Sequence, residues 1–205
     1  MTKAIPGRQA ERTERSTDAL LRAAAELIAE GGMAAMTFAA IAERAGYSRG
    51  LVTARFGSKE GLVEAMIRRV WGRLRYLRVL PGIEDRPGLD SVLVLVAGIR
   101  DQAATDSVEM RALIALMFEA VNDNGALRSR FVRFHDAMRD DLTAALRKGI
   151  KDESVRADLD PEREATMIVG ILRGTSYQWL LDPDRFDPGP AYTTVIDVLR
   201  DRLAR

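Results

Sequence analysis

The segment TFAAIAERAGYSRGLVTARF, residues 37–56, constrains the fold most, because it predicts two very short helices separated by a tight turn. Thr37 and Ser48 each precede a helical pattern, and their hydroxyls can accept from backbone N–H groups that a first helical turn leaves unpaired. Gly46 stands just beyond the first pattern, where a helix end favours the left-handed conformation that glycine adopts without strain. We therefore expect a helix, a turn and a second helix.

Apolar residues give each of these helices one inward face. In the first helix Phe38, Ile41, Ala42 and Ala45 recur at helical spacing. Val52 and Phe56 lie one turn apart in the second helix. Its outward face is then expected to carry Arg49, Gly50, Thr53 and Arg55. Two short helices around a glycine-containing turn form the helix-turn-helix, whose second helix enters the major groove of DNA.

A wider span, residues 17–66, carries further elements in the same register. An alanine-rich helix ends at Gly31-Gly32, and Ser58-Lys59-Glu60 and Leu62 follow the helix-turn-helix. Together with Thr37, Ile41-Ala42, Ala45-Gly46, Ser48, Gly50 and Phe56, these elements resemble the DNA-binding domain of the tetracycline-repressor (TetR) family of transcriptional regulators. One position departs from the family pattern, because the family usually carries an aromatic residue where this chain has Thr53.

Several residues are expected to contact DNA. Arg49 and Arg55 carry guanidinium groups that can bond guanine or phosphate, and Gly50 allows a close approach of backbone to DNA. The resemblance implies a phosphate contact for Lys59, which lies in a first helical turn where unpaired N–H groups also attract anions. The hydroxyl of Thr53 can reach a phosphate or a base. The full set is Thr37, Ser48, Arg49, Gly50, Thr53, Arg55 and Lys59.

Charge is distributed unevenly along the 205 residues. The net charge of +1 divides into +5 for residues 1–75, with 13 Lys and Arg against 8 Asp and Glu, and −4 for residues 76–205, with 18 against 22. A basic first third and an acidic remainder suit a DNA-binding domain joined to a larger effector domain. Residues 1–13 are polar and are expected to form a disordered arm, which either follows DNA phosphates or is merely solvated.

Helical patterns cover the remainder of the chain. The first helix is expected over Glu14–Glu30, a fourth, capped by Ser58, over residues 59–80, and further helices at about 88–104, 107–122, 125–151, 161–181 and 189–204. A Val- and Leu-rich run at 91–99 could form a strand, but its length and its helical neighbours favour a buried helix. We expect an all-α protein with a DNA-binding domain at residues 1–57 and an effector-binding and dimerisation domain at residues 58–205.

The last two helices are candidates for a homodimer interface. Gly170 and Gly174 lie one turn apart among apolar residues, which would let another helix approach closely. The resemblance implies that these helices pair with their symmetry mates as a four-helix bundle, and a two-fold dimer suits a palindromic operator. The alternative is that both apolar seams are intramolecular core. The interface candidates are Gly170, Gly174, Tyr192, Val195, Ile196 and Leu199.

The resemblance also implies a small-molecule effector among the middle helices, which would shift the fourth helix and move the recognition helices. Large, adaptable apolar side chains with few polar ones would suit an apolar or aromatic effector. The candidates are Met110, Met117, Phe118, Phe131, Phe134, His135, Met138, Tyr177 and Trp179. Such residues at helical spacing are more often ordinary core, so a regulator without a small-molecule effector stays an alternative.

No residue pattern points to catalysis. The chain has no cysteine and one histidine, His135, so it offers no thiolate site, no cluster with metal-ligand spacing and no convincing triad. Neither a signal peptide nor an apolar run of about 20 residues is present. The expected protein is a cytoplasmic repressor that binds a DNA operator and needs no cofactor or metal. A helical enzyme is the alternative from another class.

Overall fold

The computed structural model describes residues 7–79, 86–105, 107–122 and 125–205. Within these ranges the chain is helical and forms no strand, although an isolated bridge joins Val155 to Ala204. The helices are α1 (Arg8–Ala35), α2 (Phe38–Ala45), α3 (Arg49–Phe56), α4 (Lys59–Val79), α5 (Gly88–Thr105), α6 (Ser107–Glu119), α7 (Ala126–Lys151), α8 (Pro161–Leu181) and α9 (Pro188–Leu203). The prediction of an all-α protein is confirmed.

The helix-turn-helix forms through the local chemistry that its sequence predicts. Thr37 Oγ1 accepts from the Ala40 N–H at 3.1 Å, and Ser48 Oγ accepts from the Leu51 N–H at 3.2 Å. Each such cap is worth about 1 kcal/mol. Gly46 ends α2 in the left-handed conformation, at φ 72°. The two short helices are therefore delimited at these ends by their own residues.

Two helix ends differ from the sequence prediction. α1 begins at Arg8 rather than Glu14, because the residues after Gly7 are good helix formers with no breaker among them. The expected arm is thus wrong for residues 8–13, and residues 1–6 lie outside the described residues. α6 ends at Glu119, and a turn follows it. The expected break at Gly31-Gly32 is confirmed, since both glycines have non-helical backbone angles within α1.

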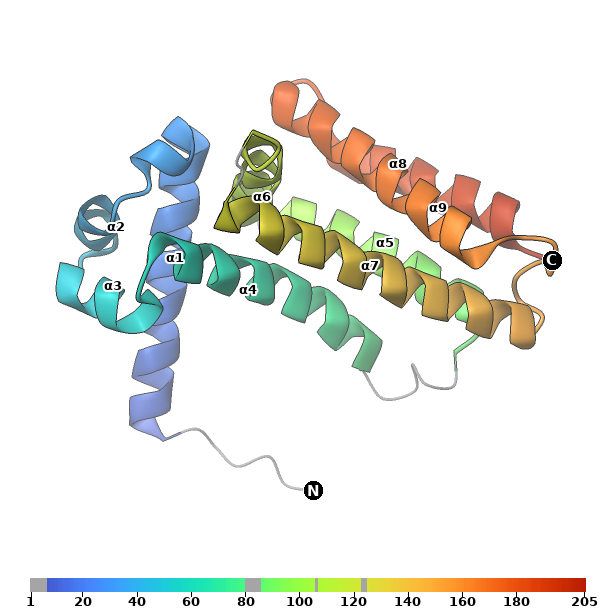
Figure 1. Cartoon of the computed structure of the whole chain (residues 1–205), viewed down its shortest axis with the longest axis horizontal. Helices are drawn as coiled ribbons and strands as arrows, with labels where there is room; N and C mark the ends of the chain where they lie inside the picture. Colours follow the sequence, from blue (N-terminus) through green and yellow to red (C-terminus); the bar gives the residue numbers. More distant parts are fainter. Residues whose placement is uncertain (1–6, 80–85, 106, 123–124) are drawn as a thin grey trace.

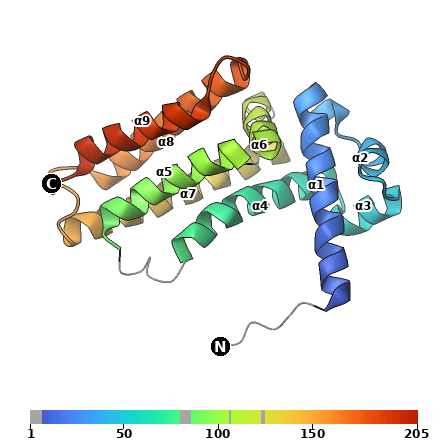
Figure 2. The same ribbon diagram turned by 180° about the vertical axis from the view of Figure 1, so that it is seen from behind.

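The helices beyond the helix-turn-helix pack in three layers (Figures 1 and 2). α4 forms the first layer, α5 and α7 the second, and α8 and α9 the third, with α9 packed on α5 and α8 on α7. α1 crosses one end of these layers and packs against α6, while α2 and α3 lie on the far side of α1. No helix in the described ranges has the length and apolarity to cross a membrane.

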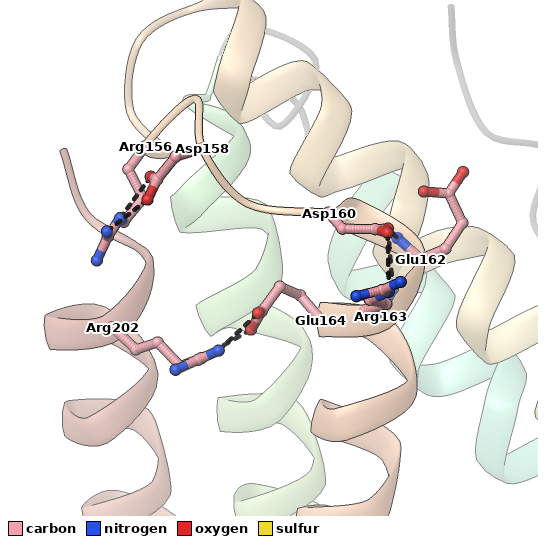
Figure 3. Close-up of polar contacts among 7 residues, drawn as sticks. All are labelled: Arg156, Asp158, Asp160, Glu162, Arg163, Glu164 and Arg202. Carbon is pink, nitrogen blue, oxygen red and sulfur yellow. Dashed lines mark hydrogen bonds and ion pairs between the residues drawn. The ribbon is translucent and has the colours of Figure 1, made fainter.

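Polar contacts fasten the two outer helices to each other (Figure 3). Glu164 on α8 is buried, and its carboxylate accepts two hydrogen bonds from Arg202 on α9, at 2.7 and 2.8 Å. This bond raises the pKa of Arg202. Asp160 caps α8 by accepting from the N–H groups of Glu162 and Arg163, and Pro161 begins the helix. The bidentate geometry fixes the register of α8 on α9.

We expect Gly88→Ala to destabilise the packing of α5 on α7. A Cβ added at Gly88 would lie 2.1 Å from the backbone nitrogen of Gly149, so the helices would have to separate. The free energy of unfolding should fall by about 1–3 kcal/mol in chemical denaturation. Gly72→Ala on α4 is the matched control, because its Cβ would meet nothing within 4 Å and alanine favours helix. Equal effects of the two substitutions would contradict this account.

Candidate nucleic-acid interface and effector site

The outward face of α3 exposes three of the residues predicted to contact DNA. Arg49, Gly50 and Thr53 are all exposed, and Thr53 Oγ1 donates to the Arg49 carbonyl at 3.1 Å. The capping residues Thr37 and Ser48 are also exposed, at the N-terminal ends of α2 and α3. A helix N-terminus presents unpaired N–H groups to an anion, so these two ends can seat phosphates on either side of the α3 face.

Arg55 is half-buried and does not lie on this outward face as predicted, while a DNA contact by Arg55 stays a prediction. Its guanidinium turns to α1, where it donates to the Thr13 carbonyl at 2.9 Å and to the hydroxyl of Thr17. The physical reason is helical spacing, because Arg55 lies three residues beyond the buried Val52 and its long side chain reaches across to α1. Arg55 therefore positions the recognition helix.

Lys59 is engaged within the protein. Its Nζ donates to the Met33 carbonyl at 3.2 Å, and the Met33 N–H donates to the Glu119 carboxylate at 3.1 and 3.2 Å. The backbone N–H and carbonyl of Met33, near the end of α1, thus connect the start of α4 with the end of α6. A phosphate contact by Lys59 stays a prediction, since an ammonium group has three donors and this structure uses one of them for Met33.

A second polar link joins the same three helices. Arg69 on α4 contacts Asp18 on α1 and, through Nε at 3.1 Å, the buried Glu109 on α6. α2 is held separately, because Arg44 makes a bidentate pair with Glu30 of α1 at 2.5 and 2.9 Å. This pair lowers the pKa of Glu30.

These contacts all involve α1, which is therefore the helix on which the helix-turn-helix, α4 and α6 meet.

The structure places further residues beside α3 that the predicted set omits. A cleft of about 490 Å³ runs between the start of α1 and α3, and its lining includes Arg12, Arg15, Tyr47 and Arg55. Tyr47 is an exposed aromatic in the turn between the two short helices. The signal for Tyr47 was its position directly before the Ser48 cap. Arg12 lies beside α3 because α1 begins earlier than its sequence pattern indicated, whereas Arg15 lies within the helix that the sequence predicts.

The nine predicted pocket residues divide into three groups by exposure. Six of them are buried in the core: Met110, Met117, Phe131, Phe134, Met138 and Trp179. Phe118 and Tyr177 are exposed and contact each other edge to face, with ring centroids 5.2 Å apart. His135 is half-buried. The exposed pair does not line the interior, and its role in ligand binding stays a prediction.

Sequence reasoning missed Arg173, which lies at the centre of the buried group. Its Nη1 donates to Met117 Sδ at 3.2 Å and its Nη2 to Met138 Sδ at 3.5 Å, while its Cζ lies 5.9 Å from the Phe134 ring centroid. Burial lowers the pKa of Arg173. The available signal was helical register, because Arg173 follows the buried Val169 by four residues and precedes the buried Ser176 by three.

An open cleft of about 310 Å³ lies on the outer side of this group. Its lining is Met117, Ala120, Val121, Arg128, Phe131, Val132, His135 and Arg139. His135 Nδ1 lies 2.9 Å from the Phe131 carbonyl, which can only accept, so Nδ1 carries the proton and Nε2 of the neutral ring is an acceptor. Burial first, and then the charge of Arg173, lower the pKa of His135.

The candidate interface residues also separate. Tyr192, Ile196 and Leu199 are 1%, 7% and 0% exposed within the single chain, so their assignment to a dimer interface is wrong. They pack inward, on the side of α9 that meets α5, and Tyr192 shares a 2.7 Å hydrogen bond with the buried Ser176 of α8. Val195 is half-buried, whereas Gly170 and Gly174 are exposed with open space beyond them.

The fold and the α3 face define a helix-turn-helix transcriptional regulator. Among the described residues, no three His, Cys, Asp or Glu side chains gather as a metal site. Residues 20–66 match the family of bacterial regulatory proteins of the tetR type, and residues 91–204 match the C-terminal domain of BetI-type transcriptional repressors. The second match covers more than half of the chain. The chain therefore belongs to the TetR family of transcriptional regulators.

Individual relatives agree with this family. The HTH-type transcriptional regulator BetI of Klebsiella pneumoniae (strain 342) is 35% identical over 98 residues, 47% of this chain, and the match spans only half of that relative's length. A putative TetR-family regulator from Rhodococcus sp. is 26% identical with a TM-score of 0.74, over 91% of this chain and 99% of that one. A putative transcriptional regulator from Saccharomonospora viridis in complex with choline has a TM-score of 0.74 over 94% of this chain and 99% of that one, but at 18% identity it shows the fold alone.

The lowered pKa of His135 predicts that acidification destabilises the protein. The unfolded chain, with a histidine pKa of about 6.5, binds a proton that the folded chain resists, so the free energy of unfolding should fall as the pH drops below that value. Denaturation midpoints between about pH 5.5 and 7 would measure this, above the range where most carboxylates titrate. Because His135 is the only histidine, His135→Gln should flatten the curve. An unchanged slope in that variant would contradict the assignment.

Proposed function

We propose that this protein is a homodimeric transcriptional repressor that holds a palindromic operator with α3 and releases it when a small ligand enters the helical region beyond α4. The observation that carries the proposal is the exposed α3 face of Arg49, Gly50 and Thr53, held on α1 by Arg55. A guanidinium on the first turn of a recognition helix can make a bidentate contact with guanine, and the adjacent glycine removes the side chain that would hold the backbone away.

The DNA contact set retains most of its predicted members. Arg49 reads a base, Thr53 contacts a base or phosphate, and Thr37, Ser48 and Lys59 bind the phosphate backbone. Arg12, Arg15 and Tyr47 extend this surface along the cleft between α1 and α3. The contacts of the positively charged residues with phosphate would make operator binding steeply dependent on salt. We retain residues 1–57 as the DNA-binding unit and residues 58–205 as the effector and dimerisation unit.

A strip on α8 is the proposed dimer surface. Thr166, Gly170, Gly174, Tyr177 and Leu181 are all exposed, recur at three- and four-residue spacing and carry no charge. A Cβ at either glycine would meet nothing within 4 Å, so a helix from a second copy could approach the backbone there. Two copies related by a two-fold axis would present two α3 helices to the half-sites of a palindrome.

Helix α6 is the proposed route from ligand to DNA. Met117 lines the α6–α7 cleft and contacts Arg173, and Glu119, two residues later, binds the Met33 N–H of the DNA-binding region. A ligand that displaces Met117 would move a helix whose end is bonded to α1. Because α1 also holds α3 through Arg55, such a movement would change the spacing of the two recognition helices.

Arg49→Ala should weaken binding to the operator by about 1–3 kcal/mol and relax base preference at one position of each half-site. The measurement is fluorescence anisotropy with the DNA upstream of the protein's own gene, over a salt series and with scrambled DNA for comparison. Arg185→Ala removes an exposed arginine far along the chain and should leave affinity unchanged. If both variants bound like the original protein, Arg49 would not be a base-reading residue.

Gly170→Arg should convert the dimer to a monomer, because the added side chain would occupy the space that a second α8 needs. Sedimentation velocity over a concentration series would give the mass. Gly72→Arg is the matched control on α4, where an added Cβ also meets open space and no dimer contact is proposed. A Gly170→Arg protein that still sedimented as a dimer would remove the α8 strip from the interface.

A further inference from the structure

Arg173 is a half-buried cation that forms no ion pair among the described residues. Two of its guanidinium nitrogens donate to the thioethers of Met117 and Met138, and its Nε is buried with no hydrogen-bond partner. The ring of Phe134 lies against its Cζ. Among the described residues, no carboxylate forms an ion pair with it.

This environment is a poor one for an arginine. Thioether sulfur is a weak acceptor, and a desolvated charge without a counter-charge is unfavourable. Burial lowers the pKa of Arg173, but a guanidinium stays charged in proteins at neutral pH. A methionine or leucine would fill the same volume without that cost. The chain therefore holds a positive charge in an apolar surrounding that an incoming anion would neutralise.

The route to Arg173 leads through the α6–α7 cleft. Met117 lines that cleft and also accepts from Arg173, so its side chain separates the guanidinium from the open space. Methionine is unbranched and has three rotatable bonds, so it can move aside. Arg128, Arg139 and the half-buried His135 are the polar residues of the cleft lining within the described part of the chain, and none of the described lining residues is acidic.

We propose that Arg173 binds the head group of the effector, and that the effector is an amphiphile with a carboxylate on an apolar body. The carboxylate would replace the two sulfur acceptors with a bidentate, charge-assisted pair, the strongest partner for a guanidinium. The apolar body would lie along Met117 and Phe131 in the cleft. The identification of this ligand class rests on the proposed function of the helical region as an effector site.

Isothermal titration calorimetry with three ligands of equal chain length tests the proposal. Decanoate, decanol and decyltrimethylammonium share the apolar chain and differ in the charge of the head. The two ionic ligands are used below their critical micelle concentrations, and decanol below its solubility limit. The full-length protein should bind decanoate at least about tenfold more tightly than the other two, since a bidentate charged pair is worth more than 1.4 kcal/mol. Equal affinities, or no binding of any of the three, would overturn the proposal.

Arg173→Met is the decisive variant, because it keeps the apolar volume and removes the charge. It should fold, melt at a higher temperature than the original protein and lose the preference for decanoate. Arg173→Lys should keep part of the preference, and Arg163→Met, an exposed arginine of the same helix, should keep all of it. A preference that survived in Arg173→Met would also overturn the proposal. Operator binding is measured in the absence of ligand. A protein that shows no preference for decanoate but still binds its operator specifically would therefore overturn only the ligand assignment, whereas loss of specific operator binding would count against the proposed function.

Discussion

The hydrogen bond between the Glu119 carboxylate and the Met33 N–H is the contact on which the arrangement of the molecule depends. It joins the end of α6 to the break in α1, and it exists because Gly32 adopts a left-handed conformation at φ 64° without a side chain. A Cβ on Gly32 would lie 2.2 Å from Glu119 Oε1. The glycine pair that interrupts α1 is thus also the place where the helical region beyond α4 reaches the DNA-binding region.

Other polar contacts strengthen the same junction. Lys59 binds the carbonyl of Met33, and Arg69 contacts Asp18 and Glu109, so α1, α4 and α6 are tied together by charged groups at two levels. Polar links of this kind are directional, and they can break and re-form when a helix shifts, whereas apolar packing tolerates several arrangements. A junction of this kind suits a regulator that changes the spacing of its recognition helices. Helix α6 carries both Met117, which contacts Arg173, and Glu119, which binds the Met33 N–H.

Local features were predictable where one short stretch of chain decides them. The caps at Thr37 and Ser48, the left-handed Gly46 and the break at Gly31-Gly32 all follow from residue type and position. Periodicity showed that α9 has an apolar seam but not which surface covers it. Tyr192, Ile196 and Leu199 are buried within the single chain, where α9 packs on α5. Periodicity could not predict this, because an apolar residue packs equally well on a helix of its own chain and on a helix of a second copy.

Residue type and spacing were enough to predict the helix-turn-helix and the family resemblance, which depend on capping and helical spacing within about fifty residues. The all-α class followed from helical patterns along the rest of the chain. Tertiary contacts account for the rest: Arg55 bonds to α1, Tyr47 lines a cleft with Arg12 and Arg15, and Arg173 contacts two methionine sulfurs with no ion pair among the described residues. These contacts depend on the length of a side chain and on how the helices pack, which a local sequence pattern does not specify. Long side chains and exposed turns find partners 35 to 60 residues away, as Arg55 does with Thr13 and Arg173 with Met117, and nothing in the local pattern specifies those partners.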